Sequence, residues 1–144
     1  MHLTSYSDYA MRILIYLGSH PDRPLVSVRE ISDTFHTSYH HIGKITFNLS
    51  KLGILETVRG RNGGIRLAKS PLDINLGAVL RMTEENFHLV ECFHEDRNTC
   101  KISPSCHLKH ILHEALEAYL TVMDSYTLAD VLTNAKTLRK LMAL

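Results

Sequence analysis

The chain has 144 residues, 44% of them hydrophobic, and a formal net charge of +1, a size that suits one globular domain or one small domain with an added oligomerisation element. No apolar run reaches the roughly 18 residues of a membrane span, and the N-terminal segment lacks the charged-then-apolar layout of a signal peptide. We therefore expect a cytoplasmic protein without membrane contact.

The first predicted helix begins at Tyr6 and ends near Gly18 and Pro21. Its apolar residues recur at helical spacing, at Ala10, Ile13, Leu14 and Leu17. This spacing predicts that one face of the helix is buried.

Two further helices are predicted with a short turn at 36–37 between them. A capping box, in which Ser27 and Glu30 satisfy each other's backbone donors, opens the first of the two and carries it to Phe35. Ser38 is expected to cap the second, and Gly53 to close it in a left-handed conformation. The inward stripe of this helix is Ile42, Ile45, Leu49 and Leu52. The pair predicts a helix-turn-helix.

A hairpin follows, with strands over 55–58 and 65–67. Asn62-Gly63 is expected to supply the positive backbone angles of a tight turn, which makes the hairpin a candidate wing. A brief helix over 76–82 leads into a polar, irregular loop over 83–105.

A wide apolar stripe predicts a long helix over 108–123. The tail, 127–144, is expected to form one further helix from a Thr-x-x-Asp cap, and it is too small to cover that stripe. A second copy of the chain is the simplest cover, so we expect a symmetric homodimer.

Basic residues concentrate in the first part of the chain. Residues 1–80 hold nine Lys and Arg against six Asp and Glu, whereas residues 81–144 hold seven against nine. Groups suited to phosphates and base edges lie on the outer face of the third predicted helix and at the hairpin tip: Ser38, Tyr39, His40, His41, Lys44, Asn48, Lys51, Arg59 and Arg61. With the helix, turn, helix and basic hairpin in this order, they predict binding to double-stranded DNA, the alternative being a solvent-facing helix and a charged hairpin.

The expected fold is mainly α, a winged helix-turn-helix with a long C-terminal dimerisation helix. We expect a DNA-binding domain over 1–82, a cysteine-bearing loop over 83–106, and the dimerisation helix with its tail over 107–144. The sequence offers no catalytic triad that can be placed in one site and no phosphate-cradling glycine loop, so an enzyme is not expected.

All three cysteines fall in one segment, as Cys92, Cys100 and Cys106. Soft thiolates suit zinc or an iron-sulfur cluster, and the spacing lacks the Cys-x2-Cys knuckles of structural zinc sites. Three thiolates can hold three corners of a four-iron cluster, which leaves one iron to a harder ligand. Candidates for that ligand are His94, His107, Glu91 or a residue of a second copy, and three unliganded thiols are the alternative.

Motifs over nearly the whole chain carry a resemblance to a known family: Leu3-Thr4-x-Tyr6-x-Asp8-Tyr9-Ala10, Leu49-x-x-Leu52-Gly53, Val58-x-Gly60-x-Asn62-Gly63-Gly64-x-x-Leu67-Ala68, Val90-Glu91-Cys92-Phe93 and Tyr126-Thr127-Leu128-Ala129-Asp130-Val131. In these segments the chain resembles the bacterial iron-sulfur winged-helix regulators. That family includes nitric oxide-sensitive repressors and regulators of iron-sulfur biogenesis. In biogenesis regulators a histidine lies three residues past the last cysteine, where this chain has Lys109.

The resemblance implies a homodimeric repressor on a palindromic operator that releases DNA when nitric oxide reaches a 4Fe-4S cluster. The implied ligands are Cys92, Cys100, Cys106 and Asp8 of the partner subunit. For Asp8 the alternative is an ordinary capping and dipole partner in the first helix. An iron- or cluster-responsive regulator of the same family is the nearest alternative function. A thiol-regulated repressor, a zinc-stabilised regulator and a small iron-sulfur electron carrier without DNA binding are the others.

Overall fold

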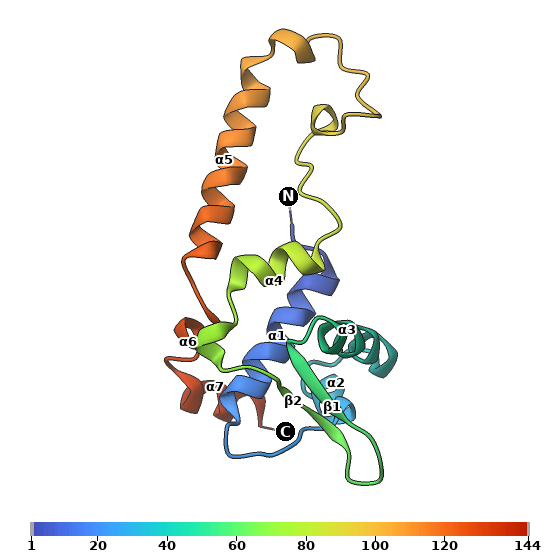
Figure 1. Cartoon of the computed structure of the whole chain (residues 1–144), viewed down its shortest axis with the longest axis vertical. Coiled ribbons are helices and arrows are strands. Elements are labelled where there is room, and N and C mark those ends of the chain that lie inside the picture. The colour runs from blue at the N-terminus through green and yellow to red at the C-terminus, as the bar shows by residue number, and fades with distance from the viewer. Residues whose placement is uncertain (1, 144) are drawn as a thin grey trace.

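The structure, a computed structural model, describes residues 2–143. It consists of a body, made of α1 to α4, the hairpin, α6 and α7, and an arm, residues 84–124, in which the long helix α5 projects from the body (Figure 1). The elements are α1 Ser5–Ser19, α2 Val28–Thr34, α3 Tyr39–Lys51, β1 Leu55–Val58, β2 Gly64–Leu67, α4 Leu76–Thr83, α5 His107–Asp124, α6 Leu128–Val131 and α7 Ala135–Met142, with short 3-10 turns at Pro71–Asp73, Glu91–Phe93 and Ser103–Ser105. The mainly α, winged-helix class is confirmed. Within residues 2–143, no helix has the length and apolarity needed to cross a membrane.

Helix α1 forms the centre of the body. It contacts α3, α4, α6, α7 and β2. Its predicted apolar positions are buried, with Ala10, Ile13 and Leu14 all 0% exposed. Thr4 caps the helix, because its side chain accepts a hydrogen bond from the backbone N–H of Ser7.

The helix-turn-helix of α2 and α3 is confirmed, but its caps differ from the expectation. Ser27 Oγ accepts from the Glu30 N–H at 3.1 Å, whereas the Glu30 carboxylate accepts from the Tyr16 hydroxyl and the Arg23 guanidinium instead of returning to Ser27. The reciprocal capping box is therefore wrong, because a cation offers that carboxylate a stronger, two-point partner. Ser38 occupies the N-cap position of α3, but its side chain makes no capping bond.

The wing is an antiparallel pair in which Val58 lies opposite Gly64. The prediction that Asn62-Gly63 supplies positive backbone angles is wrong, because the positive φ of this loop, 117°, is at Gly60. The loop over 59–63 is longer than a two-residue turn, and the Gly63 N–H closes it on the Gly60 carbonyl at 3.0 Å. Gly63 is needed for a different reason, since a Cβ there would overlap the Val58 carbonyl oxygen.

The arm is attached to the body where α4 meets the end of α5. Asn75 caps α4, and its Nδ2 also donates to the Asp124 carbonyl at 2.6 Å. Arg81 forms an ion pair with the Asp124 carboxylate. A Cβ at Gly77 would overlap that carboxylate. These contacts hold the base of α5 close to α4.

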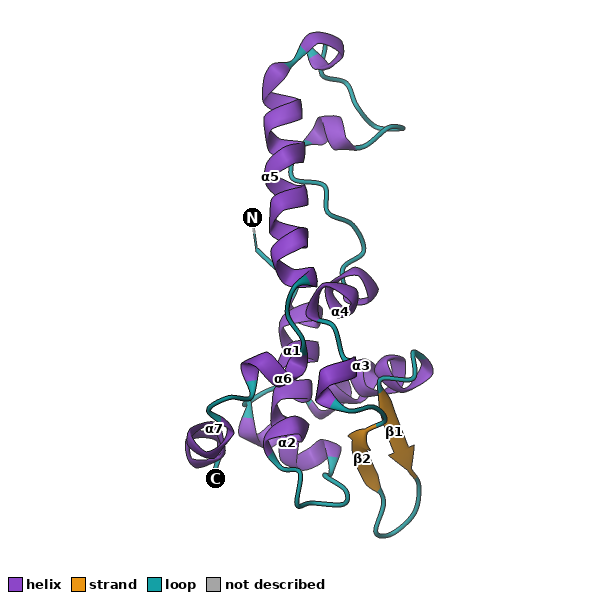
Figure 2. Ribbon diagram, turned by 60° about the vertical axis from the view of Figure 1, so that its left-hand side comes forward, coloured by secondary structure: helices purple, strands orange, loops and turns teal. Residues whose placement is uncertain are grey.

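The tail differs from the single helix that we expected. The Thr127 cap is confirmed as a capping box with Asp130, but the chain then breaks into α6 and α7. The physical reason is that the Leu132 side chain packs directly on Gly18, where a Cβ would overlap it. The chain thereby turns back so that α7 lies against α1 in the body (Figure 2). The tail therefore leaves most of α5 uncovered.

Candidate DNA interface and cysteine loop

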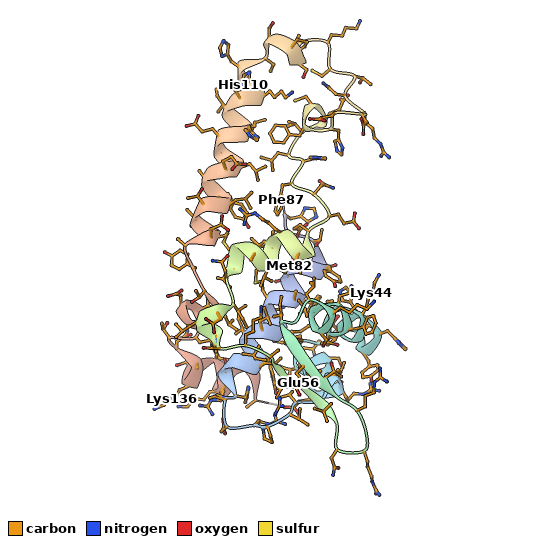
Figure 3. The ribbon with its side chains drawn as sticks, in the orientation of Figure 1. Lys44, Glu56, Met82, Phe87, His110 and Lys136 are labelled. Carbon is orange, nitrogen blue, oxygen red and sulfur yellow. The ribbon has the colours of Figure 1, made fainter. Side chains whose placement is uncertain are left out.

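The outer face of α3 is a solvent-exposed, partly basic surface. Tyr39, His40, Lys44 and Lys51 are exposed there, as is Ser38 at the helix start. Lys44 lies on the outer side of the helix (Figure 3). These side chains can reach phosphates or base edges without a change in the fold of the body.

Two of the predicted DNA-binding residues are instead engaged with α1. The His41 ring meets the Tyr9 ring edge-on, with centroids 5.3 Å apart, and its buried Nε2 has no hydrogen-bond partner among residues 2–143. Asn48 Nδ2 donates to the Tyr6 hydroxyl at 2.8 Å. His41 and Asn48 therefore lie at the edge of the surface and connect it to α1.

The sequence analysis missed Arg29 as a member of this surface. The Arg29 guanidinium lies 4.8 Å from the centroid of the Tyr39 ring, a cation–π contact between α2 and the first turn of α3. The sequence places Arg29 inside a capping segment, so the position signalled a helix start and not a ligand contact.

The hairpin tip carries two further cations, Arg59 and Arg61. Both are exposed, and neither has an ion-pair partner among residues 2–143. Arg66 differs, since its Nε and Nη2 donate to the Glu56 carboxylate at 2.9 and 3.0 Å, and this hydrogen-bonded pair holds the pKa of Glu56 below its usual range. The free positive charge of the wing is therefore at its tip.

The wing and α3 are tied together. Ser50 Oγ and Thr57 Oγ1 lie 2.8 Å apart and join the end of α3 to β1. A reading helix and a wing on connected regular elements form a more precise surface than two independent loops.

The three cysteines lie along the loop that climbs beside α5 and leads into its start (Figure 1). Cys92 is in the turn Glu91–Phe93, and Cys106 is the N-cap residue of α5. All three, including Cys100, are free thiols of intermediate exposure. They are accessible without being fully solvated.

Hydrogen bonds close the cysteine loop on itself. The Glu91 carboxylate accepts from both the N–H and the hydroxyl of Thr99 at 2.6 Å. Because these residues directly precede Cys92 and Cys100, the bonds hold the two cysteine-bearing turns beside each other. These two hydrogen bonds hold the pKa of Glu91 below its usual range, and the bond from the Thr99 hydroxyl contributes more than the bond from its N–H. This engaged carboxylate was one of the candidate iron ligands.

The two histidines that were candidate iron ligands, His94 and His107, lie in different surroundings. His94 Nε2 lies 3.0 Å from His88 Nδ1, and His107 is exposed at the start of α5. A cavity of about 700 Å³ separates the Cys92 turn from α5 and is lined by Cys92, His94 and His110 among others. His110 lies on the upper part of α5 (Figure 3).

Asp8 forms an ion pair with Arg12 in the next turn of α1. Its Oδ1 accepts from Arg12 Nε at 3.0 Å, and Oδ2 lies 2.7 Å from Nη2, with both side chains 45% exposed. Since Thr4 caps the helix, Asp8 is not the capping side chain, whereas its position in the first turn agrees with the alternative role of a partner for the helix dipole.

Within residues 2–143, no three or more His, Cys, Asp or Glu side chains are gathered closely enough to hold a metal ion. The donor chemistry nevertheless fits an iron-sulfur cluster, because three thiols free of disulfides lie within one segment, residues 92–106. Four-thiolate coordination needs one more cysteine than the chain has. A four-iron cluster held by one chain would therefore need one ligand of another type.

Comparison with known proteins identifies relatives over the whole chain. The model of the Rrf2 family, described as an iron-dependent transcriptional regulator, matches residues 3–134. The HTH-type transcriptional regulator NsrR of Halalkalibacterium halodurans is 53% identical over 144 residues, which are 100% of this chain and 99% of that protein. NsrR of Bacillus subtilis is 48% identical over 142 residues, 99% and 97% of the two chains. In fold, the solved structure of IscR from T. potens aligns with a TM-score of 0.74 at 24% identity, over 94% of this chain and 88% of that one.

Proposed function

The chain belongs to the Rrf2 family of transcriptional regulators, and on this premise we propose that it is a homodimeric, DNA-binding repressor that senses nitric oxide through an iron-sulfur cluster. It is a regulator and not an enzyme. The proposed site of action is the cytoplasm, where thiols stay reduced. The observation that carries the proposal is the division of the molecule, with an exposed basic helix and wing at one end and three free cysteines at the other (Figure 1).

In the DNA half, α3 enters the major groove of an operator and the wing tip lies along a neighbouring groove. Lys44 and Lys51, with Arg59 and Arg61, hold phosphates, while Ser38, Tyr39 and His40 present polar groups at the start of the helix. His41 and Asn48 position α3 instead of contacting DNA, because their contacts with Tyr9 and Tyr6 fix the angle of α3 on α1.

The DNA half is tested by replacing Lys44, Arg59 and Arg61 together with alanine. Binding should weaken, and the slope of log affinity against log salt should fall by about 0.9 per lost phosphate contact. Lys136→Ala is the matched control, an exposed cation on α7, away from α3 (Figure 3). An unchanged salt slope in the triple variant would contradict the assignment.

The proposed dimerisation depends on α5. Leu116 and Leu120 are the residues of this helix that the chain itself buries. An exposed apolar seam runs along another side, with spacings of three and four residues: Leu108, Ile111, Ala115, Tyr119 and Val122. Such spacing is that of helices that pair along their length. We infer that this seam pairs with the same helix of a second copy in a palindrome-reading dimer.

The proposed cluster, a 4Fe-4S cluster, supplies iron atoms that react with nitric oxide. Cys92, Cys100 and Cys106 would hold three of its irons, and Asp8 of the partner subunit would hold the fourth. Both Asp8 carboxylate oxygens contact Arg12, so ligation of iron would replace at least one of these two contacts.

A physical route from Asp8 to the operator runs through α1. Asp8 lies between Tyr6 and Tyr9 in the sequence, and these two tyrosines contact Asn48 and His41 of α3. A shift of the first turns of α1 on ligand loss is therefore transmitted to the side chains that set the angle of α3.

A second candidate is an iron-responsive regulator of the same family, favoured by the iron-dependent description of the family model. It uses the same ligands and differs in the signal. Because the relatives are transcriptional regulators, the electron-carrier alternative loses its support.

The test is anaerobic purification, assay of iron and sulfide, and a gel shift on promoter DNA. We expect iron and sulfide with visible absorption, DNA binding by the loaded protein, and release on addition of nitric oxide. Release by iron chelation without any response to nitric oxide would favour the second candidate. Tight DNA binding by a protein without iron or sulfide would contradict both.

A further inference from the structure

Gly43 is an unexplained residue in the middle of α3. Glycine disfavours a helix more than any residue except proline, so its presence in a helix interior calls for a reason. The other glycines have one, since a Cβ at Gly18, Gly63, Gly64 or Gly77 would meet a neighbour closer than 3 Å, and Gly53 and Gly60 have positive φ. At Gly43 a Cβ would meet nothing within 4 Å. No contact within residues 2–143 therefore requires this glycine.

Phe47 lies one turn further along α3 and is 55% exposed. Residues four apart are neighbours on a helix surface, so the ring stands next to the bare backbone of Gly43. The Lys51 ammonium lies 4.5 Å from the ring centroid, and Lys44 is exposed one turn earlier on the same side. An apolar ring and an open backbone patch thus lie between two cations.

This combination suits a polyanion that brings apolar groups to the helix. The two lysines attract phosphates, and this attraction favours DNA as the partner over an uncharged apolar protein surface. Thymine is the base whose major-groove edge carries an apolar group, its 5-methyl. Phenylalanine is one of the side chains that contacts this methyl, and a glycine beside it lets the edge of the base approach the helix axis.

We propose that Phe47 and Gly43 form a thymine-reading patch on α3, in which the Phe47 ring packs against the 5-methyl groups of thymines in the operator. This inference rests on the proposed DNA binding and adds a base preference that the polar residues of α3 do not supply. Phe47 acts as a specificity-determining residue, whereas Lys44 and Lys51 supply sequence-independent attraction.

The test needs an operator that the protein itself selects. Full-length protein, purified anaerobically, is used to enrich binding sites from a random duplex library. Each thymine of the enriched site is then replaced singly by deoxyuridine, which removes the methyl and keeps the base-pairing edge. Affinities are measured for the wild type, Phe47→Ala, Gly43→Ala and the control Leu72→Ala, which truncates an apolar side chain that is 71% exposed outside α3.

We expect wild-type affinity to fall about fourfold for each contacted methyl removed. In Phe47→Ala the same replacements should have no effect, and Leu72→Ala should keep the wild-type pattern. Gly43→Ala should melt at a higher temperature than the wild type, because alanine favours the helix, and yet bind the operator more weakly.

Three results would overturn the thymine-reading patch. One is a wild type that binds every deoxyuridine operator equally well while still preferring the operator to random DNA, which leaves the proposed repressor function intact. Another is a Phe47→Ala variant that keeps the wild-type pattern but loses dimer mass in sedimentation, which makes this face a protein interface. The third is failure to enrich any site, which removes the proposed DNA binding together with the patch.

Discussion

The body and the arm of this protein differ in how completely the chain covers its own apolar side chains. In the body, Ile13, Leu14 and Ile45 are 0% exposed. In the arm, Leu108 and Ile111 are each 60% exposed, on a helix with a continuous apolar seam. Burial of apolar area is the main source of folding free energy. The body therefore has its own hydrophobic core, whereas we infer that the arm obtains part of its stability from a second copy and from a bound cluster.

The cysteine-bearing loop, which we propose to be the sensor, therefore lies in the region that covers fewer of its own apolar side chains. Segments with few buried contacts open locally at low free-energy cost and are the ones that move in regulation. A cysteine loop of this kind can respond to the loss of a ligand while the body that holds α3 stays folded.

The largest expected effect comes from placing a charge in the exposed seam. Ile111→Asp should dissociate the dimer, because two copies of the side chain leave the interface at about 1.5 to 3 kcal/mol each, a loss of roughly 100- to 20,000-fold in affinity. Sedimentation at micromolar concentration measures it. Glu117→Lys, at an exposed position on the side of α5 away from this seam, should remain a dimer. A dimeric Ile111→Asp, or a monomeric wild type, would contradict the proposed seam.

The next effect tests whether the stability of the body core is independent of the proposed dimer contact. Leu14→Ala empties a fully buried site and should lower the free energy of unfolding by about 2 to 5 kcal/mol. The loss should be the same in the Ile111→Asp background, since the Leu14 site belongs to the body. Urea unfolding of both pairs checks this. Strong coupling between the two substitutions would show that the Leu14 site and the seam of α5 are not energetically independent.

The body was also the more predictable region from sequence. Spacings of three and four residues identified α1 and α3, and the Thr127 cap located α6, since these signals depend on neighbours in the chain. The bridge from Val26 to Ile65, with hydrogen bonds of 3.0 and 2.8 Å, was missed because nothing local marks Val26 as a strand partner. The wing turn failed for a related reason, since loop length, and not the Asn62-Gly63 pair, decides where positive φ falls.

In the arm, the sequence predicted a wide apolar stripe on α5, but it could not separate the residues that pack on this chain from those that stay exposed. Leu116 and Leu120 pack on this chain, while Leu108 and Ile111 do not, and that division depends on how α4 meets α5. Likewise the cysteine spacing suggested a metal, but the Glu91–Thr99 closure that brings two of the turns together is a tertiary contact.

A smaller effect concerns a charged network inside the body. The Glu30 carboxylate accepts from Arg23 and Tyr16, and the Arg23 hydrogen bond, as the largest contribution, lowers the pKa of Glu30 from 4.5. A carboxyl with a lowered folded-state pKa stabilises the fold above its unfolded pKa and loses that effect as pH falls through the folded value. Glu30→Gln should therefore cost about 1 kcal/mol near neutral pH, and the difference should shrink at an acidic pH below 4.5, as the pH falls through the lowered pKa of Glu30.

Urea unfolding of monomeric Ile111→Asp variants at both pH values isolates this network from the dimer. Glu56→Gln is the control, because its fully solvated pair with Arg66 should contribute less at either pH. A Glu30→Gln difference that persists at the acidic pH would mean that packing, and not charge, is responsible.

The smallest effect on stability is expected at Asp8, where body and arm are proposed to meet in the dimer. Asp8→Ala removes an exposed pair with Arg12, which is worth about 0.3 to 0.5 kcal/mol, so the melting temperature should hardly change. The visible circular dichroism of Asp8→Ala under anaerobic conditions should nevertheless change. The iron content should be retained, because three thiolates still hold the cluster. Thr4→Ala is the converse control: loss of the α1 cap should cost about 1 kcal/mol and leave the spectrum as it is. If Asp8→Ala kept the wild-type spectrum and its response to nitric oxide, the carboxylate would be a partner of Arg12 alone, and the fourth ligand would have to come from another residue.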